Sequence, residues 1–211
     1  MKAADIDLMN SIRINSYEQA MQYLTIMRQV NSCVNLYSSK LPLNKLLRYV
    51  MRSVELYLTI LQSHPKCSTI LDIGSGNGLP GIILGILGTR VIMVDSNIKK
   101  CAFLTLIVSK LHLDAKIINS RIEEIDTMQV CTNEDNRIII TASAFSRVKK
   151  LISICMESFE LSNIEIFLLK GENVANEIDE ASEKFTFQSS IIHSAYDARS
   201  TILILKNISS K

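Results

Sequence analysis

A glycine-rich turn between two apolar runs constrains the fold of this chain more than any other feature. The apolar run 69–73 leads into a turn with glycine at every second position, Gly74, Gly76 and Gly78. A second apolar run, 91–94, ends at Asp95. Glycine is needed where a loop turns sharply and where its backbone must come close to a ligand. The layout predicts a cofactor cradle at the carboxyl ends of parallel strands.

The rest of the chain divides at His64-Pro65-Lys66, because the residue before a proline is pushed out of helical conformation. Before this point, apolar residues at helical spacing predict helices over 17–36 and 42–61. The stripe of the second helix is expected at Leu43, Leu46, Leu47, Val50, Val54 and Leu58, and that of the first at Tyr17, Ala20, Met21, Leu24, Met27 and Val30. We expect a helical extension over 1–66 and an α/β domain over 67–211, joined in one compact unit.

Strands and helices alternate after Pro65, and this pattern predicts an open, mostly parallel sheet with helices on both faces. Helices are expected from near Pro80 and over 97–111, 146–160 and 174–184, and strands over 69–73, 91–94, 115–118, 137–141 and 164–169. The polar stretch 132–136 leads into the fourth strand. Two final runs, 185–193 and 201–206, alternate with period two and predict a terminal antiparallel pair.

Composition excludes several classes of protein. Hydrophobic residues make up 47% of the 211 residues, enough for a sizeable core, and the longest apolar stretch is interrupted by Pro80, glycines and Arg90. The five cysteines are scattered and never spaced as CxxC, and the three histidines lie far apart. We therefore expect a cytoplasmic protein with reduced thiols, no membrane span and no metal.

Positive charge is concentrated in two places. The first 66 residues hold eight basic and four acidic residues, and a second basic cluster comprises Arg147, Lys149 and Lys150. Clustered positive charge on one side suits a phosphate backbone. Ordinary solvated helix faces explain the same charges equally well, so charge alone leaves both interpretations open.

The glycine turn fits two kinds of cofactor. Gly76-x-Gly78-x-x-Gly81 matches a nicotinamide-type pattern, whereas Asp72-x-Gly74-x-Gly76-x-Gly78 is typical of S-adenosylmethionine enzymes. Both cofactors require an acid after the second strand to accept hydrogen bonds from ribose hydroxyls, and Asp95 meets that requirement. Asp72 either holds the loop or binds the amino end of methionine.

Further segments carry a resemblance to a known family. Residues 71–86 contain a Gly-Leu-Pro-Gly continuation of the glycine turn, and similar blocks follow at 94–104, 119–124 and 169–171. In this order, the blocks resemble the bacterial small-subunit ribosomal RNA guanine-N7 methyltransferases, also called glucose-inhibited division protein B. The resemblance covers most of residues 20–206 and implies a Rossmann-like methyltransferase fold with S-adenosylmethionine as cofactor.

The resemblance also implies a function and a set of residues. The reaction would be methyl transfer to N7 of a guanine in small-subunit (16S) ribosomal RNA, on the RNA itself or on the small ribosomal subunit. Cofactor contacts would fall on Gly74, Leu79, Ile122, Glu123 and Ser143. The chain departs from the family at Ser143, where an arginine is usual, and at Tyr49 and Arg52, where a histidine and an aspartate are usual.

Guanine N7 has a lone pair and no proton to remove, so we expect catalysis to depend on positioning. Cys101 and Cys155 lie on apolar helix faces and are not expected to act as nucleophiles. Two cations at strand ends, Arg121 and Lys170, are candidate catalytic residues that would contact phosphates or base edges, although ion pairing at a strand end would place them equally well. RNA contacts are expected from Arg48, Arg52, Arg147 and Lys170.

Three other functions remain open from the sequence. The chain could be a methyltransferase for a small molecule or a protein, or a nicotinamide-dependent oxidoreductase. The departures at Ser143, Tyr49 and Arg52 are also compatible with an RNA-binding homologue of impaired activity. The terminal antiparallel pair and the lack of a separate substrate domain argue against the oxidoreductase.

Overall fold

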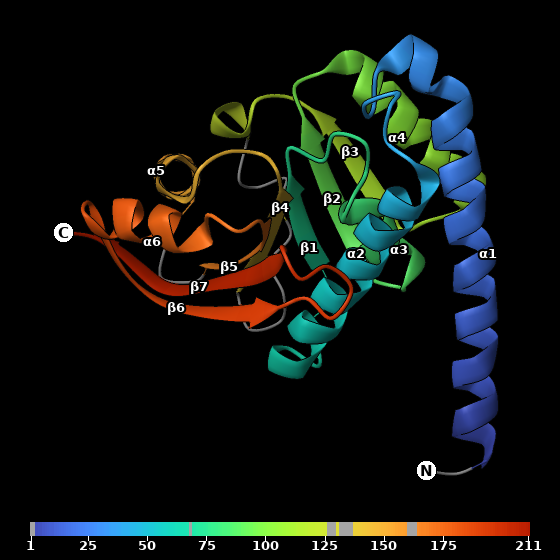
Figure 1. The fold of residues 1–211 in the computed structure, drawn as a ribbon, viewed down its shortest axis with the longest axis horizontal. Helices are drawn as coiled ribbons and strands as arrows, with labels where there is room; N and C mark the ends of the chain where they lie inside the picture. Colours follow the sequence, from blue (N-terminus) through green and yellow to red (C-terminus); the bar gives the residue numbers. More distant parts are fainter. Residues whose placement is uncertain (1–2, 68, 126–129, 131–136, 160–163) are drawn as a thin grey trace.

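The computed structural model describes residues 3–67, 69–125, 130, 137–159 and 164–211. These residues form three layers, a seven-stranded sheet between two layers of helices (Figure 1). The strand order is β3-β2-β1-β4-β5-β7-β6. Of the segments named above, only 132–136 lies wholly outside the described residues.

The sheet is parallel in its first five strands. These are β1 (Thr69–Ile73), β2 (Arg90–Asp95), β3 (Ala115–Asn119), β4 (Ile138–Ser143) and β5 (Ile164–Lys170). The last two, β6 (Phe185–His193) and β7 (Thr201–Ser210), pair antiparallel with each other, and β7 also pairs antiparallel with β5. The predicted α/β fold with a terminal antiparallel pair is confirmed.

Both faces of the sheet are buried. Side chains alternate along a strand, so Ile70 and Met93 face one helical layer whereas Leu71 and Ile92 face the other. This explains why the central strands read as continuous apolar runs, because a polar residue on either face would be buried.

The first helical layer contains α1 (Ala3–Val34), α2 (Leu43–Ser63), α3 (Gly81–Ile86) and α4 (Ile98–Leu111). Helix α1 runs along one side of the molecule (Figure 1) and starts well before the predicted residue 17. No glycine or proline lies between Ala3 and Tyr17, so no helix-breaking residue prevents the helix from beginning earlier than predicted. Tyr17, expected on the apolar stripe, is 66% exposed; Tyr23, Leu24 and Met27 form the buried face.

The buried face of α2 differs from the predicted stripe. Leu43, Leu47 and Leu58 are exposed, and the buried residues are Leu46, Val50, Ser53, Leu56, Thr59 and Ile60. Ser53 and Thr59 can be buried because their hydroxyls donate to the carbonyls of Tyr49 and Glu55, one turn earlier. The stripe predicted from apolar residues is therefore confirmed at Leu46 and Val50 and wrong at the three exposed leucines.

The second helical layer contains α5 (Val148–Ser158), α6 (Val174–Ser182) and the short 3₁₀ helix η1 (Ile122–Glu124). Helices α5 and α6 pack against each other and cover β4, β5 and β7 through Val148, Ile152 and Val174. Glu177 of α6 accepts a hydrogen bond from the Val148 amide, which fixes the start of α5.

A buried carboxylate ties α2 to the amino end of the sheet. Glu165 on β5 accepts hydrogen bonds from His64 (2.8 Å), Lys206 (2.7 Å) and Arg137. Burial opposes ionisation of Glu165, but the partners Lys206, His64 and Arg137 outweigh it and lower its pKa. This cluster lies at the end of the strands opposite to the glycine turn and serves the fold.

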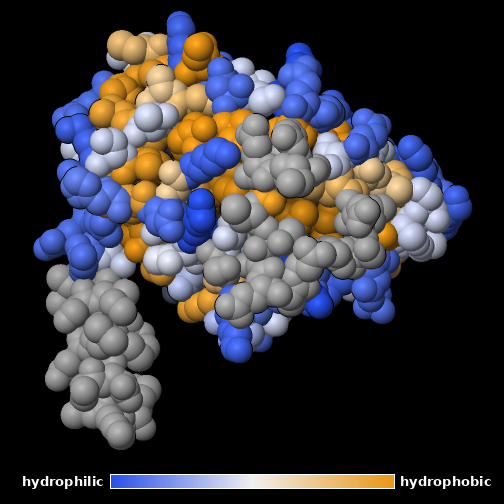
Figure 2. Space-filling view, turned by 180° about the vertical axis from the view of Figure 1, so that it is seen from behind, coloured by the Kyte–Doolittle hydropathy of each residue, from blue (hydrophilic) through white to orange (hydrophobic). Residues whose placement is uncertain are grey.

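Seen from behind, the molecule has hydrophilic residues around its rim and hydrophobic residues gathered towards the middle of that face (Figure 2). Within the part of the chain that the structure describes, none of the helices combines the length and the apolar character needed to cross a membrane.

Candidate functional site

The glycine turn follows β1 at the carboxyl end of the sheet. Gly74 and Gly78 have φ values of +65° and +96°, a region that favours glycine. A Cβ on Gly74 would lie 2.2 Å from the ring of Phe145, and one on Gly78 would lie 2.6 Å from Ile82. Close packing therefore requires glycine at both positions.

Asp95, at the end of β2, holds the glycine turn in place. One carboxylate oxygen accepts the Gly76 amide at 2.8 Å, and the other accepts the Asn97 amide at 2.8 Å. A carboxylate offers about four acceptor sites, so Asp95 keeps capacity for ribose hydroxyls. The residue predicted to bind ribose is thus also a support of the loop.

Asp72 is completely buried beneath the turn. Its Oδ1 accepts a hydrogen bond from Thr141 at 2.8 Å. Burial raises the pKa of Asp72 to about 6, against the lowering effect of hydrogen bonds from Ser75 and Thr141. Of the two roles that the sequence left open, this position favours holding the loop over contact with the cofactor.

Tyr23 of α1 supports the turn from the opposite side. Its hydroxyl donates to the Asn77 carbonyl at 2.7 Å, and burial, followed by the nearby charge of Asp72, raises the pKa of Tyr23. Tyr23 was not among the functional residues predicted from the sequence. Its position could have been noticed in the sequence, because Tyr23 adjoins Leu24 and precedes Met27 by one helical turn, which places it on the buried face of the helix.

Two adjoining cavities open beside the turn. The first, of about 590 Å³, lies between the turn and the carboxyl ends of β4 and β5. The second, of about 350 Å³, lies beyond the ends of β2 and β3. Both are lined by Gly74, Lys100, Ala144 and Ser146, so they form one two-lobed space.

Most of the predicted cofactor residues line this space. Gly74, Gly76, Leu79 and Ser143 line the first cavity, and Asp95, Ile122 and Glu123 line the second. Asp72 and Gly78 line neither cavity: Asp72 is buried beneath the turn, and Gly78 is part of the turn and packs against Ile82. A cofactor with an amino-acid end and a nucleoside end fits such a space, because glycine backbone borders one lobe and a strand-end carboxylate borders the other.

The cations that were predicted to bind RNA do not all lie at one cavity. Arg52, Arg147 and Lys170 line the first cavity, whereas Arg48 is exposed on α2 and lines neither cavity. Arg121 lies beside the second cavity. The structure therefore does not bring the two candidate catalytic residues, Arg121 and Lys170, into one cavity.

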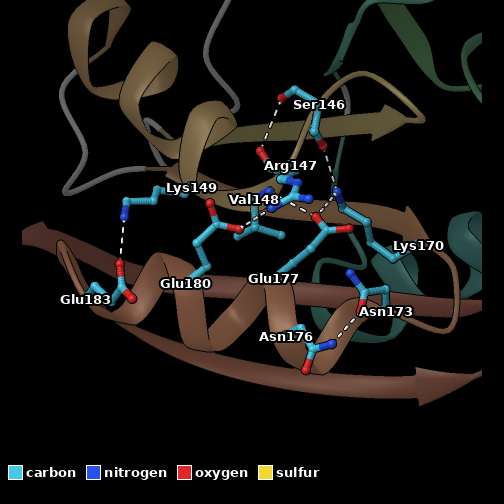
Figure 3. Close-up of polar contacts among 10 residues, drawn as sticks. All are labelled: Ser146, Arg147, Val148, Lys149, Lys170, Asn173, Asn176, Glu177, Glu180 and Glu183. Atoms are coloured by element: carbon cyan, nitrogen blue, oxygen red, sulfur yellow. Dashed lines mark hydrogen bonds and ion pairs between the residues drawn. The ribbon is translucent and has the colours of Figure 1, made fainter.

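Lys170 is held by two partners at the end of β5. Its Nζ donates to Glu177 Oε2 at 2.6 Å and to the Ser146 carbonyl at 2.7 Å, and its side chain is 10% exposed (Figure 3). Lys170 thus forms the strand-end ion pair that the sequence left as an alternative. An ammonium has three donors, so one remains for a ligand in the cavity.

Acidic residues at three-residue spacing on α6 and at its C-cap hold the neighbouring cations. Glu180 pairs with Arg147 and Glu183 with Lys149, each at 2.8 Å (Figure 3). Together with Glu177 they form the α6 acidic row, defined as Glu177, Glu180 and Glu183. Two of the cations predicted to contact RNA, Arg147 and Lys170, are thereby paired with carboxylates of α6, and Lys149 of the second basic cluster is paired with the residue that follows this helix.

Arg52 reaches the first cavity from α2. Its guanidinium donates to the Lys170 carbonyl at 3.3 Å and lies 5.8 Å from the ring centroid of Tyr49. The buried Nε has no hydrogen-bond partner among the described residues. Burial lowers the pKa of Arg52, and the charge of Asp197 opposes this shift. The side chain keeps donors available at the cavity.

The site holds no obvious nucleophile or proton-transfer pair among the described residues. Burial raises the pKa of Cys101 and raises that of Cys155 to about 12, so both thiols stay protonated. No described histidine or cysteine lines either cavity. Among the described ranges, no three His, Cys, Asp or Glu side chains come together as a potential metal site. The arrangement suits binding and orientation.

Solved structures with the same fold include methyltransferases. An O-methyltransferase from Bacillus cereus, in complex with SAH, is 12% identical with a TM-score of 0.59, covering 90% of this chain and 91% of that one. Magnesium protoporphyrin IX methyltransferase from Synechocystis, with bound SAM, is 9% identical with a TM-score of 0.58, covering 88% and 97%. At these levels of identity, the likeness shows the fold alone.

Sequence comparison gives the family. The model of the family described as rRNA small subunit methyltransferase G matches residues 16–202. Ribosomal RNA small subunit methyltransferase G of Dinoroseobacter shibae is 33% identical over 162 residues, covering 74% of this chain and 77% of the relative. The protein of that name from Rickettsia massiliae is 31% identical over 186 residues, covering 87% and 89%. The chain belongs to this family, which confirms the predicted family and cofactor and sets aside the oxidoreductase.

Proposed function

We propose that this chain transfers a methyl group from S-adenosylmethionine to N7 of a guanine in small-subunit ribosomal RNA. The observation that carries the proposal is the first cavity, in which the glycine turn faces the cations Arg52, Arg147 and Lys170. The relatives are named as small-subunit ribosomal RNA methyltransferases, which supports RNA over a small molecule or a protein.

We propose that residues of the first cavity hold the methionine part of the cofactor and that residues of the second cavity hold its nucleoside part. Main chain from Gly74 to Gly76, with Leu79 and Ser143, would surround the methionine part in the first cavity. Asp95 would accept ribose hydroxyls, and Ile122 and Glu123 would bracket the adenine in the second. When bound, S-adenosylmethionine supplies a methyl group that is already activated as part of a sulfonium.

The residues of the first cavity then have to orient the guanine. N7 offers a lone pair and no proton, so no general base is required, in keeping with a cavity lined by no described histidine or cysteine. Holding two reactants in line accounts for a large part of the rate enhancement in such reactions. Tyr49 and Arg52 border this cavity where the family usually has a histidine and an aspartate.

Ser143 lacks the positive charge of the arginine that is usual at this position in the family. Two other cations in the same cavity could supply that charge. Lys100 lines both lobes, its ammonium forms no hydrogen bond with described residues, and its Nζ lies 4.0 Å from the position of a Cβ on Gly76. Arg147 also lines the cavity but is paired with Glu180. We therefore propose that Lys100 compensates for the absent arginine and that the enzyme is active.

On the RNA side, we propose that Arg52, Arg147 and Lys170 contact the nucleotide region around the target and that Arg48 binds a more distant phosphate. Arg121 would act near the adenosine end. The substrate is either ribosomal RNA or the small ribosomal subunit, and we propose that the reaction takes place in the cytoplasm. No metal is required for these steps.

The test is incubation of the protein with methyl-labelled S-adenosylmethionine and either naked 16S ribosomal RNA or small subunits from a strain lacking the enzyme. Label on a single guanine, sensitive to the chemical cleavage specific for 7-methylguanine, is the expected result. Asp95→Ala serves as a control that should abolish labelling. Binding of both cofactor and RNA without any transfer would reject the proposal and favour the impaired RNA-binding homologue.

A further inference from the structure

Among the described residues, the first cavity is lined by several cations and a single acid, Glu177. We propose that Glu177 recognises the target guanine by accepting hydrogen bonds from its N1–H and N2 amino group. The inference rests on the proposed function and names the residue that selects the base.

Glu177 is rigidly placed in the first turn of α6. Its Oε2 accepts hydrogen bonds from Lys170 Nζ at 2.6 Å and from the Val148 amide at 3.0 Å. Lys170 is in turn fixed by the Ser146 carbonyl (Figure 3). Two donors on one oxygen leave the other oxygen, Oε1, without a hydrogen bond to the described residues. The side chain as a whole is 16% exposed, and Oε1 is not among the buried polar atoms without a partner, so this acceptor is accessible from the cavity.

The chemistry of the bases makes a free carboxylate selective. Guanine presents two adjacent donors, N1–H and the N2 amino group, on its Watson–Crick edge, whereas none of the other three bases has two adjacent donors there. A carboxylate has only acceptors, so it matches guanine and is repelled by the acceptor atoms of the others. Sites that hydrogen-bond a base edge discriminate strongly, because a wrong base leaves buried groups unpaired.

This mode of recognition leaves the reacting atom free. N7 lies on the edge of the purine opposite to N1 and N2, so a base held by Glu177 would turn N7 away from α6. The glycine turn borders the same cavity of about 590 Å³ as Glu177. A base between them could have its Watson–Crick edge on α6 and N7 towards the cofactor lobe.

The same contact would also favour the reaction. Methylation at N7 leaves a positive charge on the purine ring, which makes N1–H and the N2 amino group stronger donors. Hydrogen bonds from these groups to a carboxylate therefore strengthen as the charge develops, and such interactions accelerate a reaction. The nearby cations Arg52 and Lys170 cannot provide this effect.

The experiment compares Glu177→Gln with the wild type on RNA that carries guanine or inosine at the mapped target position. Inosine lacks only the N2 amino group and keeps N1–H, O6 and N7. RNA affinity is measured with the demethylated cofactor bound, and kcat/KM is measured for methylation. We expect the wild type to prefer guanine by roughly tenfold, in the range of one charge-assisted hydrogen bond.

In Glu177→Gln, kcat/KM on guanine should fall by about 10- to 100-fold, and the guanine-to-inosine ratio should approach one in both measurements. The ratio compares two RNAs on one protein, so partial misfolding of the variant cancels. Glu180→Gln is the matched control: Glu180 lies one turn further along α6 and does not line the cavity, although its partner Arg147 does. Freeing Arg147 should change the binding of both RNAs alike, so the guanine-to-inosine ratio should stay at the wild-type value.

A wild-type ratio in Glu177→Gln overturns the inference and leaves Glu177 with the role of supporting Lys170. If the wild-type protein methylates no RNA, the proposed function fails instead. The affinity for the demethylated cofactor should stay within about twofold of wild type in Glu180→Gln, since Glu180 lines neither cavity. In Glu177→Gln it should fall far less than kcat/KM does, because Glu177 does not line the nucleoside lobe.

Discussion

At the scale of single residues, the glycine turn is the most sensitive part of the molecule. Gly74 combines a positive φ of +65° with a Cβ position 2.2 Å from the Phe145 ring. An added methyl group must therefore displace that ring and also strain the backbone. The same ring lines the second cavity, so its position matters for binding as well as for folding.

Gly74→Ala should lower the free energy of unfolding by about 1–3 kcal/mol and weaken binding of the demethylated cofactor by at least about tenfold. Urea denaturation and calorimetric titration measure the two effects. Gly88→Ala is the control, because Gly88 has a φ of +95°, lines neither cavity and has open space within 4 Å of where a Cβ would lie. It should lose stability only. Wild-type cofactor affinity in Gly74→Ala would contradict the prediction.

Asp72 gives a pH-dependent prediction. Burial raises its pKa from 3.8 to about 6, so the native state holds a proton there that the unfolded chain has lost. The native state is stabilised because it binds this proton more tightly than the unfolded chain does. That stabilisation is complete below pH 3.8 and is lost as the pH rises to about 6. Asp72→Asn removes this titration. Relative to the variant, the wild type should lose about 3 kcal/mol over that interval, at about 1.4 kcal/mol per pH unit.

The measurement is urea denaturation of both proteins at several pH values between about 4 and 7. Above about pH 6, the difference between the two proteins should become constant. Parallel stability profiles across the whole interval would show that Asp72 is ionised in the native protein and would refute the prediction.

At the scale of elements, the α6 acidic row offsets positive charge on the side of the site where we propose that RNA binds. The row pairs with Lys170, Arg147 and Lys149, cations that would otherwise face an incoming phosphate backbone. Two of these pairs are well exposed and are weak interactions that phosphates can displace. We therefore expect the α6 acidic row to limit non-specific binding of RNA.

The double variant Glu180→Gln with Glu183→Gln should bind RNA about three- to tenfold more tightly at low salt. The slope of log K against log salt should become steeper by up to about 1.4, since two freed cations each release about 0.7 counterion from a single strand. Filter binding over a salt series measures both. Glu172→Gln with Asp179→Asn changes the charge equally but frees no cation in the described structure, and should give less than half the effect.

At the scale of the whole molecule, the N-terminal helices and the sheet share one core. Leu24 and Met27 of α1 belong to the same buried cluster as Ile82, Phe103 and Phe167. Tyr23 extends this contact to the glycine turn. We infer that residues 1–66 and 67–211 unfold together as one cooperative unit.

Leu24→Ala should lower the free energy of unfolding by about 2–5 kcal/mol while the transition stays single. Circular dichroism and tyrosine fluorescence should report the same midpoint during denaturation. Leu58→Ala, at a position that is 52% exposed, should change stability by no more than about 0.5 kcal/mol. Two separate transitions would contradict the inference of one unit.

The sequence by itself determined the features that depend on neighbouring residues. Alternation of apolar runs with helical periods specified the parallel sheet, and the bounds of β1 and β6 agree with the predicted ones. The glycine turn and Asp95 were identifiable because a strand, a turn and an acid at the next strand end form a local pattern. The same segments were sufficient to indicate the family.

Only the tertiary structure decided which distant residues meet. The contact of Tyr23 with Asn77 joins residues 54 positions apart, and Ser146 reaches Lys170 across 24. Which of the many apolar residues of α2 are buried depended on the packing partners of the helix, and Ser53 and Thr59 share that face because hydroxyls bonded within the helix can be buried at little cost. Pairing between side chains depends on the relative placement of whole elements, and no local pattern encodes that placement.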